Sequence, residues 1–136
     1  MKNILTILLL LGALVAGRAA ETVTPAQRLA ALGLTLPAVS PVIANYVPAV
    51  RSGHLVFLAG QVARGADGKI LTGKVGRDLT EAQAAEAART CALQLLAALQ
   101  AEIGDLAKVK RIVLVGGFVN CTDDFTAQPK VVNGAS

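Results

Sequence analysis

Two stretches of the chain place apolar residues at helical spacing. In residues 81–103 the apolar positions recur every three or four residues and form one stripe, made of Ala85, Ala88, Ala92, Leu95, Leu96, Leu99 and Ile103. Thr80 and Gln83 have the spacing of a capping box before this stripe, and Gly104 follows it. These signals predict a helix from about Glu81 to Ile103.

A shorter helix is predicted at residues 25–32. Thr24 is placed to cap it, Pro25 occupies its first position, and Gln27 completes a second capping box. Gly33 follows the last apolar position, where a glycine in a left-handed conformation commonly ends a helix.

Two β-rich runs, residues 45–51 and 54–62, are separated by Ser52-Gly53, a pair typical of a hairpin turn. Because Leu55–Leu58 is continuously apolar, we expect the second strand to be covered on both faces. Pro48 places the first strand at a sheet edge or at a bulge.

A longer β-rich run covers residues 109–120, with a bulge predicted at Gly116-Gly117. A short strand is expected at Ile70-Leu71. Strand, long helix and strand in this order predict a right-handed βαβ unit, with the helix across one face of the sheet. After this run, Asp123-Asp124 is suited to cap a helix and Pro129 to open one, but no further periodic segment follows.

The first 19 residues have the three parts of a secretory signal. Lys2 adds positive charge, Ile4–Ala16 is an apolar run of 13 residues, and Gly17-Arg18-Ala19 places small residues where a signal peptidase reads them. A membrane span needs about 20 apolar residues. We therefore expect a signal peptide at 1–19, a mature domain at 20–136, and a secreted or periplasmic protein without a stable membrane anchor. The alternatives are an uncleaved anchor or lipid-facing helix, and a wrongly assigned start codon.

Removal of residues 1–19 would lower the net charge. The chain has 13 basic and 9 acidic residues, and the loss of Lys2 and Arg18 leaves 11 basic and 9 acidic residues, a net charge of +2. Aromatic residues make up 3% of the chain, too few to offer stacking platforms for single-stranded bases. Both properties argue against nucleic acid as a partner.

Residues able to carry chemistry are few. Cys91 falls on the stripe of the long helix and Cys121 at a strand end, so small apolar side chains are favoured over a disulfide. With His54 as the single histidine and no CxxC pair, we expect no metal site, and no cofactor-binding motif is present. Tyr46 is the single tyrosine, and it lies at an irregular strand entry where its hydroxyl can face a cleft.

Ten short motifs resemble, in order and spacing, one branch of the RidA (YjgF) family, also called the endoribonuclease L-PSP family. They are Asn45–Val50 with Arg51-Ser52-Gly53, Leu58–Gln61, Gly73–Gly76, Thr90–Leu93, Gly104–Leu106, Val109–Arg111, Gly117–Asn120, Asp124-Phe125, Gln128–Lys130 and Asn133–Ser136. The resemblance implies an α/β (α+β) fold of the chorismate mutase-like type, with a mixed sheet and helices packed on one face. It also implies a homotrimer with small-molecule clefts between subunits.

Characterised members of that family hydrolyse reactive enamines and imines to keto acids and ammonia without a cofactor. An arginine holds the substrate carboxylate, and a positioned water attacks the imine carbon. By this resemblance Tyr46 matches the family's cleft tyrosine, and Gly60 matches the glycine whose backbone approaches the ligand; both are expected to bind substrate. Ala59 stands where the family usually has a serine, which changes that part of the pocket.

The family's arginine and the acidic residue that holds the water lie in a C-terminal segment of one helix and two strands. Nothing up to Ser136 matches that segment, so we assign no catalytic residue and interpret the chain as a fragment. Its complete form would bind small imino or enamino acids and deaminate them. The alternative is a non-catalytic ligand-binding or interaction module on the same scaffold, and ribonuclease activity ranks third.

Overall fold

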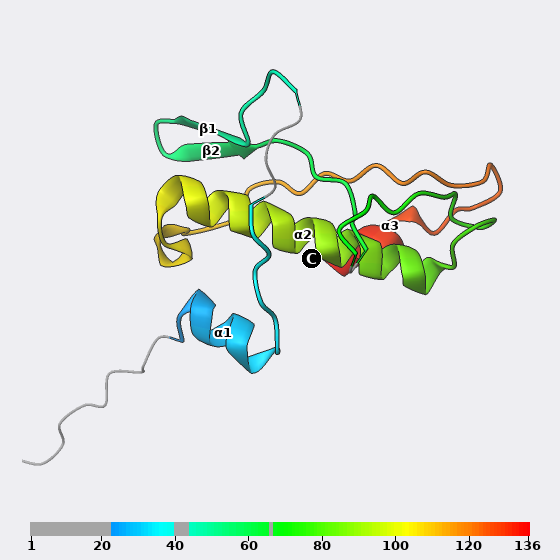
Figure 1. The fold of residues 1–136 in the computed structure, drawn as a ribbon, viewed down its shortest axis with the longest axis horizontal. Coiled ribbons are helices and arrows are strands. Elements are labelled where there is room, and N and C mark those ends of the chain that lie inside the picture. Colours follow the sequence, from blue (N-terminus) through cyan, green and yellow to red (C-terminus); the bar gives the residue numbers. More distant parts are fainter. Residues whose placement is uncertain (1–22, 40–43, 66) are drawn as a thin grey trace, which may run out of the picture.

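The computed structural model describes residues 23–39, 44–65 and 67–136. One long helix, α2 (Glu81–Ile103), lies at the centre of the molecule (Figure 1). The hairpin of β1 (Ala49–Ser52) and β2 (Leu55–Leu58) lies on one side of α2, and helix α1 (Pro25–Ala31) lies on the other. The 3₁₀ helix η1 (Leu106–Lys108) follows α2, while α3 (Gln128–Val132) and the 3₁₀ helix η2 (Asn133–Ala135) pack against it.

The expected signal peptide at 1–19 lies outside the described residues. Among the described residues, no helix is both long and apolar enough to cross a membrane.

Both predicted helices form, and both begin with the predicted capping box. At α2 the hydroxyl of Thr80 accepts from the Gln83 amide at 3.2 Å, and the Thr80 amide donates to the Gln83 side chain at 2.9 Å. Gly104 ends α2 with φ 82°, and its amide donates to the Gln100 carbonyl at 2.7 Å. Helix α1 repeats the same arrangement with Thr24 and Gln27. Local sequence therefore sets both ends of α2.

The core lies where the first turns of α2 meet the C-terminal elements. Val75, Ala84 and Val131 are each 5% exposed or less and form one cluster. Their partly buried neighbours are Ala88, Val119, Cys121 and Phe125. Because alanine occupies the α2 side of this contact, the C-terminal residues approach the helix backbone closely.

Gly134 shows how close that approach is. A Cβ at this position would collide with the carbonyl oxygen of Ala85 in α2 and would lie 2.7 Å from the carbonyl carbon. These atoms belong to helix backbone and cannot rotate away. Only glycine therefore fits between η2 and α2.

The hairpin is shorter and more open than predicted. It pairs Ala49 with Leu58 and Ser52 with Leu55 in antiparallel register, so the turn is made by Gly53 and His54 instead of Ser52-Gly53. The expectation that the second strand is covered on both faces is wrong, because Leu55 and Phe57 are exposed while their neighbours are half-buried. This strand alternates between a face toward α2 and an open face.

The predicted strand at 109–120, with its bulge, is absent from the described structure. These residues run back along α2 (Figure 1), but they pair with a neighbour only where the run ends, through a bridge between Cys121 and Val75. The expected short strand at Ile70-Leu71 is likewise reduced to one bridge, between Ile70 and Arg64. A β-rich run becomes a strand only when another strand satisfies its backbone, so the predicted βαβ unit does not form here.

The C-terminal helix begins close to the predicted position. Pro129 lies in the first turn of α3, as expected of a proline that opens a helix. Asp123-Asp124, however, forms a turn and does not cap α3, which follows Ala127 without a side-chain cap.

Candidate functional site

Tyr46 and Gly60, the two residues expected to bind substrate, lie at the open end of the hairpin. The Ala59 amide donates to the Pro48 carbonyl at 2.9 Å and so extends the pairing by one residue beyond Ala49–Leu58. Tyr46 lies two residues before Pro48, and Gly60 lies one residue after Ala59. The two predicted residues therefore come from neighbouring backbones at one end of the hairpin.

Both residues are accessible. Tyr46 is 46% exposed, with its amide donating to the Ala44 carbonyl at 2.9 Å. Gly60 is exposed, and a Cβ placed on it would meet no described atom within 4 Å. Ala59, beside Gly60, is half-buried and contributes a methyl group without a hydrogen-bonding group. The open space above Gly60 leaves its backbone available to a ligand.

The arginines near the hairpin are engaged with their own turns. Arg51 donates from Nε to the Gly53 carbonyl at 3.3 Å, and Arg64 donates from Nη1 to the Gly68 carbonyl at 2.8 Å. Neither guanidinium bonds to a group near Tyr46 in the described structure. Tyr46 and Gly60 therefore supply a phenol and an open backbone, and no cationic side chain of the described structure is bonded beside them.

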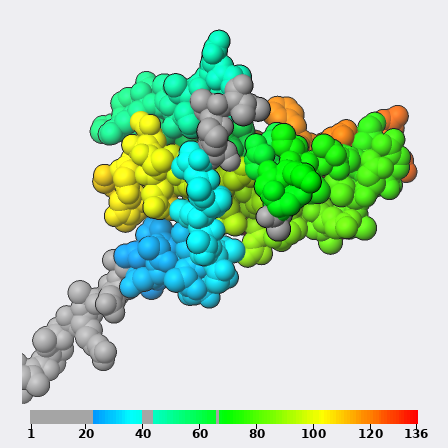
Figure 2. Space-filling view, in the orientation of Figure 1, coloured from blue at the N-terminus to red at the C-terminus, as the bar shows by residue number. Residues whose placement is uncertain are grey.

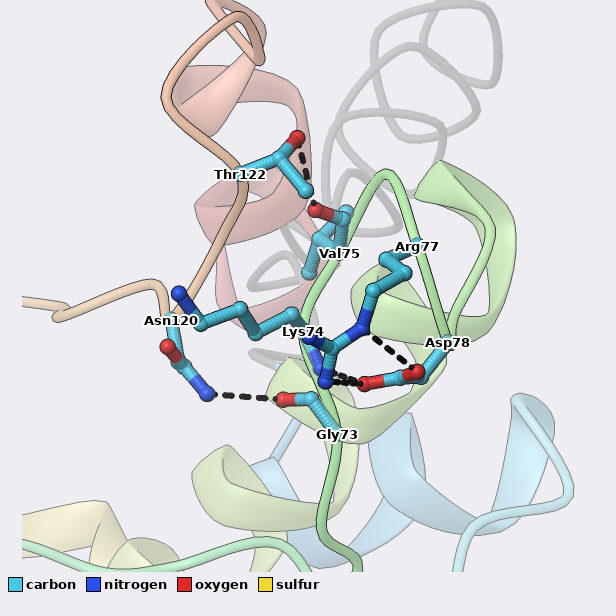
Figure 3. A network of polar contacts seen from close by, with 7 residues as sticks. All are labelled: Gly73, Lys74, Val75, Arg77, Asp78, Asn120 and Thr122. Carbon is cyan, nitrogen blue, oxygen red and sulfur yellow. Dashed lines mark hydrogen bonds and ion pairs between the residues drawn. The ribbon is translucent and has the colours of Figure 1, made fainter.

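A second polar cluster, which sequence reasoning did not identify as a unit, surrounds the turn at residues 73–79 (Figure 3). The Asp78 carboxylate accepts two hydrogen bonds from the Arg77 guanidinium, both at 2.9 Å, and one from the Lys74 amide at 2.8 Å. The Arg77 bonds, followed by the Lys74 amide, lower the pKa of Asp78 to about 2. The carboxylate is thus held ionised inside its own turn.

This turn is joined to a part of the chain 47 residues away. The Asn120 side chain donates to the Gly73 carbonyl at 2.9 Å, and the Thr122 hydroxyl donates to the Val75 carbonyl at 3.4 Å. The Val75 amide donates to the Asn120 carbonyl at 2.9 Å, and the Thr122 amide donates to the Val75 carbonyl at 3.0 Å. Because Val75 is only 4% exposed, these bonds join the turn to the buried core. Their donors and acceptors are already paired, which leaves few polar groups free for a ligand. The motif Gly73–Gly76 was visible in the sequence, but its partner residues were not.

A hollow of about 370 Å³ lies elsewhere, between residues 36–39 and the C-terminal part of α2. In Figure 2 the blue and cyan N-terminal residues lie against the yellow C-terminal part of this helix. The lining is formed by Leu36, Pro37, Ala38, Val39, Ala97, Gln100, Ala101 and Gly104. It contains neither Tyr46 nor Gly60 and offers one polar side chain, so it brings together no reactive groups.

The other sequence candidates are dispersed. His54 is exposed in the hairpin turn, and Asp123-Asp124 is exposed in its own turn. Cys91 and Cys121 are free and half-buried, and burial raises the pKa of the Cys91 thiol. The described residues contain no cluster of three His, Cys, Asp or Glu side chains that could hold a metal ion.

A long helix packed beside a two-stranded hairpin makes this a small domain of mixed α and β structure. Comparison with known proteins identifies its family. Residues 26–136 match the family model described as "YjgF/chorismate mutase-like, putative endoribonuclease". The chain belongs to this family, and the predicted fold class is confirmed.

Individual relatives are similar to this chain over most of its length. The chain is 43% identical over 111 residues to Protein TCP17 of Trypanosoma cruzi, covering 82% of this chain and 69% of that protein. It is similar to the crystal structure of the protein Atu1372, of unknown function, from Agrobacterium tumefaciens, with a TM-score of 0.70, 44% identity, and coverage of 79% of this chain and 65% of the other. A crystal structure titled "putative endoribonuclease" from Shewanella oneidensis gives a TM-score of 0.77, 34% identity, and coverage of 82% and 74%. The chain thus spans about two thirds to three quarters of these relatives.

Proposed function

We propose that this chain is part of a small-ligand-binding protein that takes small imino or enamino acids at the open end of the hairpin. Membership of the YjgF family carries the proposal, and the placement of Tyr46 and Gly60 supports it. The phenol of Tyr46 would donate a hydrogen bond to the ligand, while the backbone at Gly60 would lie against it. In the complete protein, this site would lie in a cleft between two subunits of a homotrimer. There the protein would hydrolyse the bound ligand to a keto acid and ammonia.

The binding step can be tested with a stable 2-keto acid, the product of such a reaction, titrated by NMR into the full chain. Gly60→Val would fill the open space above the backbone, and we expect at least a tenfold loss of affinity. Gly116→Val is the matched control, because a Cβ at Gly116 also meets no described atom within 4 Å. Equal affinity for all three proteins would refute the assignment of the site to Gly60.

The catalytic step needs a separate measurement. Ammonia released from freshly generated 2-aminoacrylate would be followed with the full chain and with Tyr46→Phe, which removes only the hydroxyl. Turnover that falls in the variant supports hydrolysis at this site. Turnover that is unchanged in the variant contradicts the role given to Tyr46.

A non-catalytic ligand-binding or interaction module is the second candidate. The export expected from residues 1–19 favours it, since the enzymes that generate such reactive imines act mostly in the cytosol. Binding of the keto acid without any release of ammonia would support a non-catalytic module.

Ribonuclease activity ranks third, although two of the matched descriptions contain the word endoribonuclease. A net charge of +2 after removal of residues 1–19 and an aromatic content of 3% are a poor basis for binding RNA. Incubation of the purified chain with a labelled single-stranded RNA would test this activity. If every point variant of the hairpin still cleaved the RNA, the cleavage would come from a contaminant.

Export is a further part of the proposal, based on the pattern of residues 1–19. Expression of the whole chain in a bacterium, followed by mass measurement of the periplasmic protein, should give a product beginning at Ala20, or at Glu21 if cleavage falls one residue later. An intact Met1 in the soluble cell extract would contradict it.

A further inference from the structure

The chain that carries Gly60 is held at few points within the described structure. On one side the Ala59 amide donates to a carbonyl of the facing chain at 2.9 Å, and on the other side the Ala63 carbonyl accepts from the Leu71 amide at 2.9 Å. Between these points no amide or carbonyl of residues 60–62 forms a backbone hydrogen bond with another described residue. Because glycine leaves the backbone freer than any other residue does, pairing of the hairpin alone does not fix Gly60.

A side chain of the central helix α2 reaches this stretch. The Nε2 group of Gln94 donates to the Val62 carbonyl at 3.1 Å and to the Thr90 carbonyl, one helical turn earlier, at 3.3 Å. A carboxamide nitrogen carries two hydrogens, so both bonds can form at once. The bond to Thr90 directs the amide along the helix, and the bond to Val62 ties the chain two residues beyond Gly60 to that helix. Gln94 is half-buried, which limits the competition from water for its amide.

We propose that Gln94 is a positioning residue of the ligand site, which holds the backbone of Gly60 in place through the Val62 carbonyl. This inference rests on the proposed function, because it takes Gly60 as the backbone that lies against the ligand. Binding to a loose backbone is weakened by the free energy needed to order it. The bond from Gln94 orders residues 60–62 before the ligand arrives, so it raises the affinity without contact between Gln94 and the ligand.

Substitution of Gln94 tests this role. Gln94→Met keeps the length of the side chain and removes both donors, while Gln94→Asn keeps an amide on a shorter side chain that no longer reaches Val62. Affinity for pyruvate, a stable 2-keto acid, is measured by NMR titration of the folded full chain. We expect each variant to bind pyruvate roughly three- to tenfold more weakly, the effect of losing one hydrogen bond. Gln100→Met is the matched control, since Gln100 is exposed on the same helix beside the separate hollow, and its replacement should leave the affinity unchanged.

A double substitution separates positioning from a merely structural role. If Gln94 acts through Gly60, then Gln94→Met in a Gly60→Val background should weaken binding by about twofold or less, because the backbone that it positions is already blocked. If Gln94 only attached the hairpin to α2, its substitution would lower the melting temperature and leave the affinity of the folded chain unchanged. An unchanged affinity in both Gln94→Met and Gln94→Asn, or an equal loss in the two backgrounds, would overturn the proposal.

A measurement without ligand distinguishes failure of this inference from failure of the proposed function. The nitrogen–proton heteronuclear NOE of the backbone amides reports motion on the picosecond to nanosecond timescale. It should fall at residues 60–62 in Gln94→Met and stay unchanged in Gln100→Met. If the unchanged chain bound no pyruvate, the proposed function would fail, while a lower NOE at residues 60–62 would still support the placement of this backbone by Gln94. An NOE that Gln94→Met leaves unchanged would overturn that placement, whether or not pyruvate binds.

Discussion

Replacement of Thr80 by alanine should destabilise the protein through the start of α2. The substitution removes the hydroxyl that accepts from the Gln83 amide at 3.2 Å and leaves that amide without its cap. It also releases the Gln83 side chain, which the hydroxyl contacts at 3.1 Å. The affected turn carries Ala84, one of the three buried residues of the core cluster. Fraying of this turn therefore loosens core packing as well as the helix end.

The expected cost is about 1 kcal/mol, the typical value for loss of a threonine cap. For a domain of this size, a loss of that magnitude lowers the melting temperature by roughly 3–5 °C. The same change at Thr24 should cost less, although its capping box is identical, because α1 contains no buried residue. Loss of α1 alone removes little packing from the rest of the molecule.

The assay compares thermal unfolding of Thr80→Ala, Thr24→Ala and the unchanged chain by circular dichroism at 222 nm, at one protein concentration throughout. Thr80→Ser retains the accepting oxygen and should recover most of the loss. If Thr24→Ala proves as destabilising as Thr80→Ala, or if serine recovers nothing at position 80, the account of α2 as the element that carries the core is incorrect.

Three other changes have clear expected outcomes. Gly134→Ala should lower the unfolding midpoint in urea by an amount equivalent to roughly 1–3 kcal/mol, since its Cβ would collide with the Ala85 carbonyl; an unchanged midpoint would show that η2 can move. The lowered pKa of Asp78 implies stability that is present above pH 4 and is lost as pH falls toward 2. The difference in urea midpoint between the unchanged chain and Asp78→Asn should therefore shrink over that window, and a constant difference would argue against the Arg77 contact as its source. Because burial raises the pKa of Cys91, its alkylation by iodoacetamide at pH 8, followed by mass spectrometry, should be slower in the folded chain than in urea.

Helices were easier to predict from this sequence than strands, for a physical reason. The capping residues of α2, Thr80 and Gln83, are bonded to each other, and the backbone bonds of the helix lie within residues 80–104. A strand instead depends on a partner that may lie anywhere in the chain. Residues 109–120 have the composition of a strand but pair with no other described residue along most of their length, so the pattern predicted their conformation without predicting their pairing.

The candidate site shows the same limit. Tyr46 and Gly60 were selected by resemblance to a family, and the hairpin register then explained why residues 14 positions apart lie at one end of two paired chains. The cluster around the turn at residues 73–79 was missed because two of its residues, Asn120 and Thr122, come from the chain that follows α2. Nothing in the sequence of residues 73–79 or 120–122 indicates that the two segments are in contact. Gly76 is the residue that the contact requires, since a Cβ there would collide with the Thr122 hydroxyl.

The contact between Gly73–Val75 and Asn120–Thr122 closes the intervening chain, including all of α2, into a loop joined at its base. Closing a loop of 47 residues costs roughly 3 kcal/mol of chain entropy, which the few bonds at its base and the buried Val75 must offset. Once the loop is closed, the chain enters it and leaves it at the same place, the base of the loop. A chain cut between η1 and residue 119 would therefore yield two pieces that still meet at this base, one bringing Val75 and the other bringing Asn120 and Thr122.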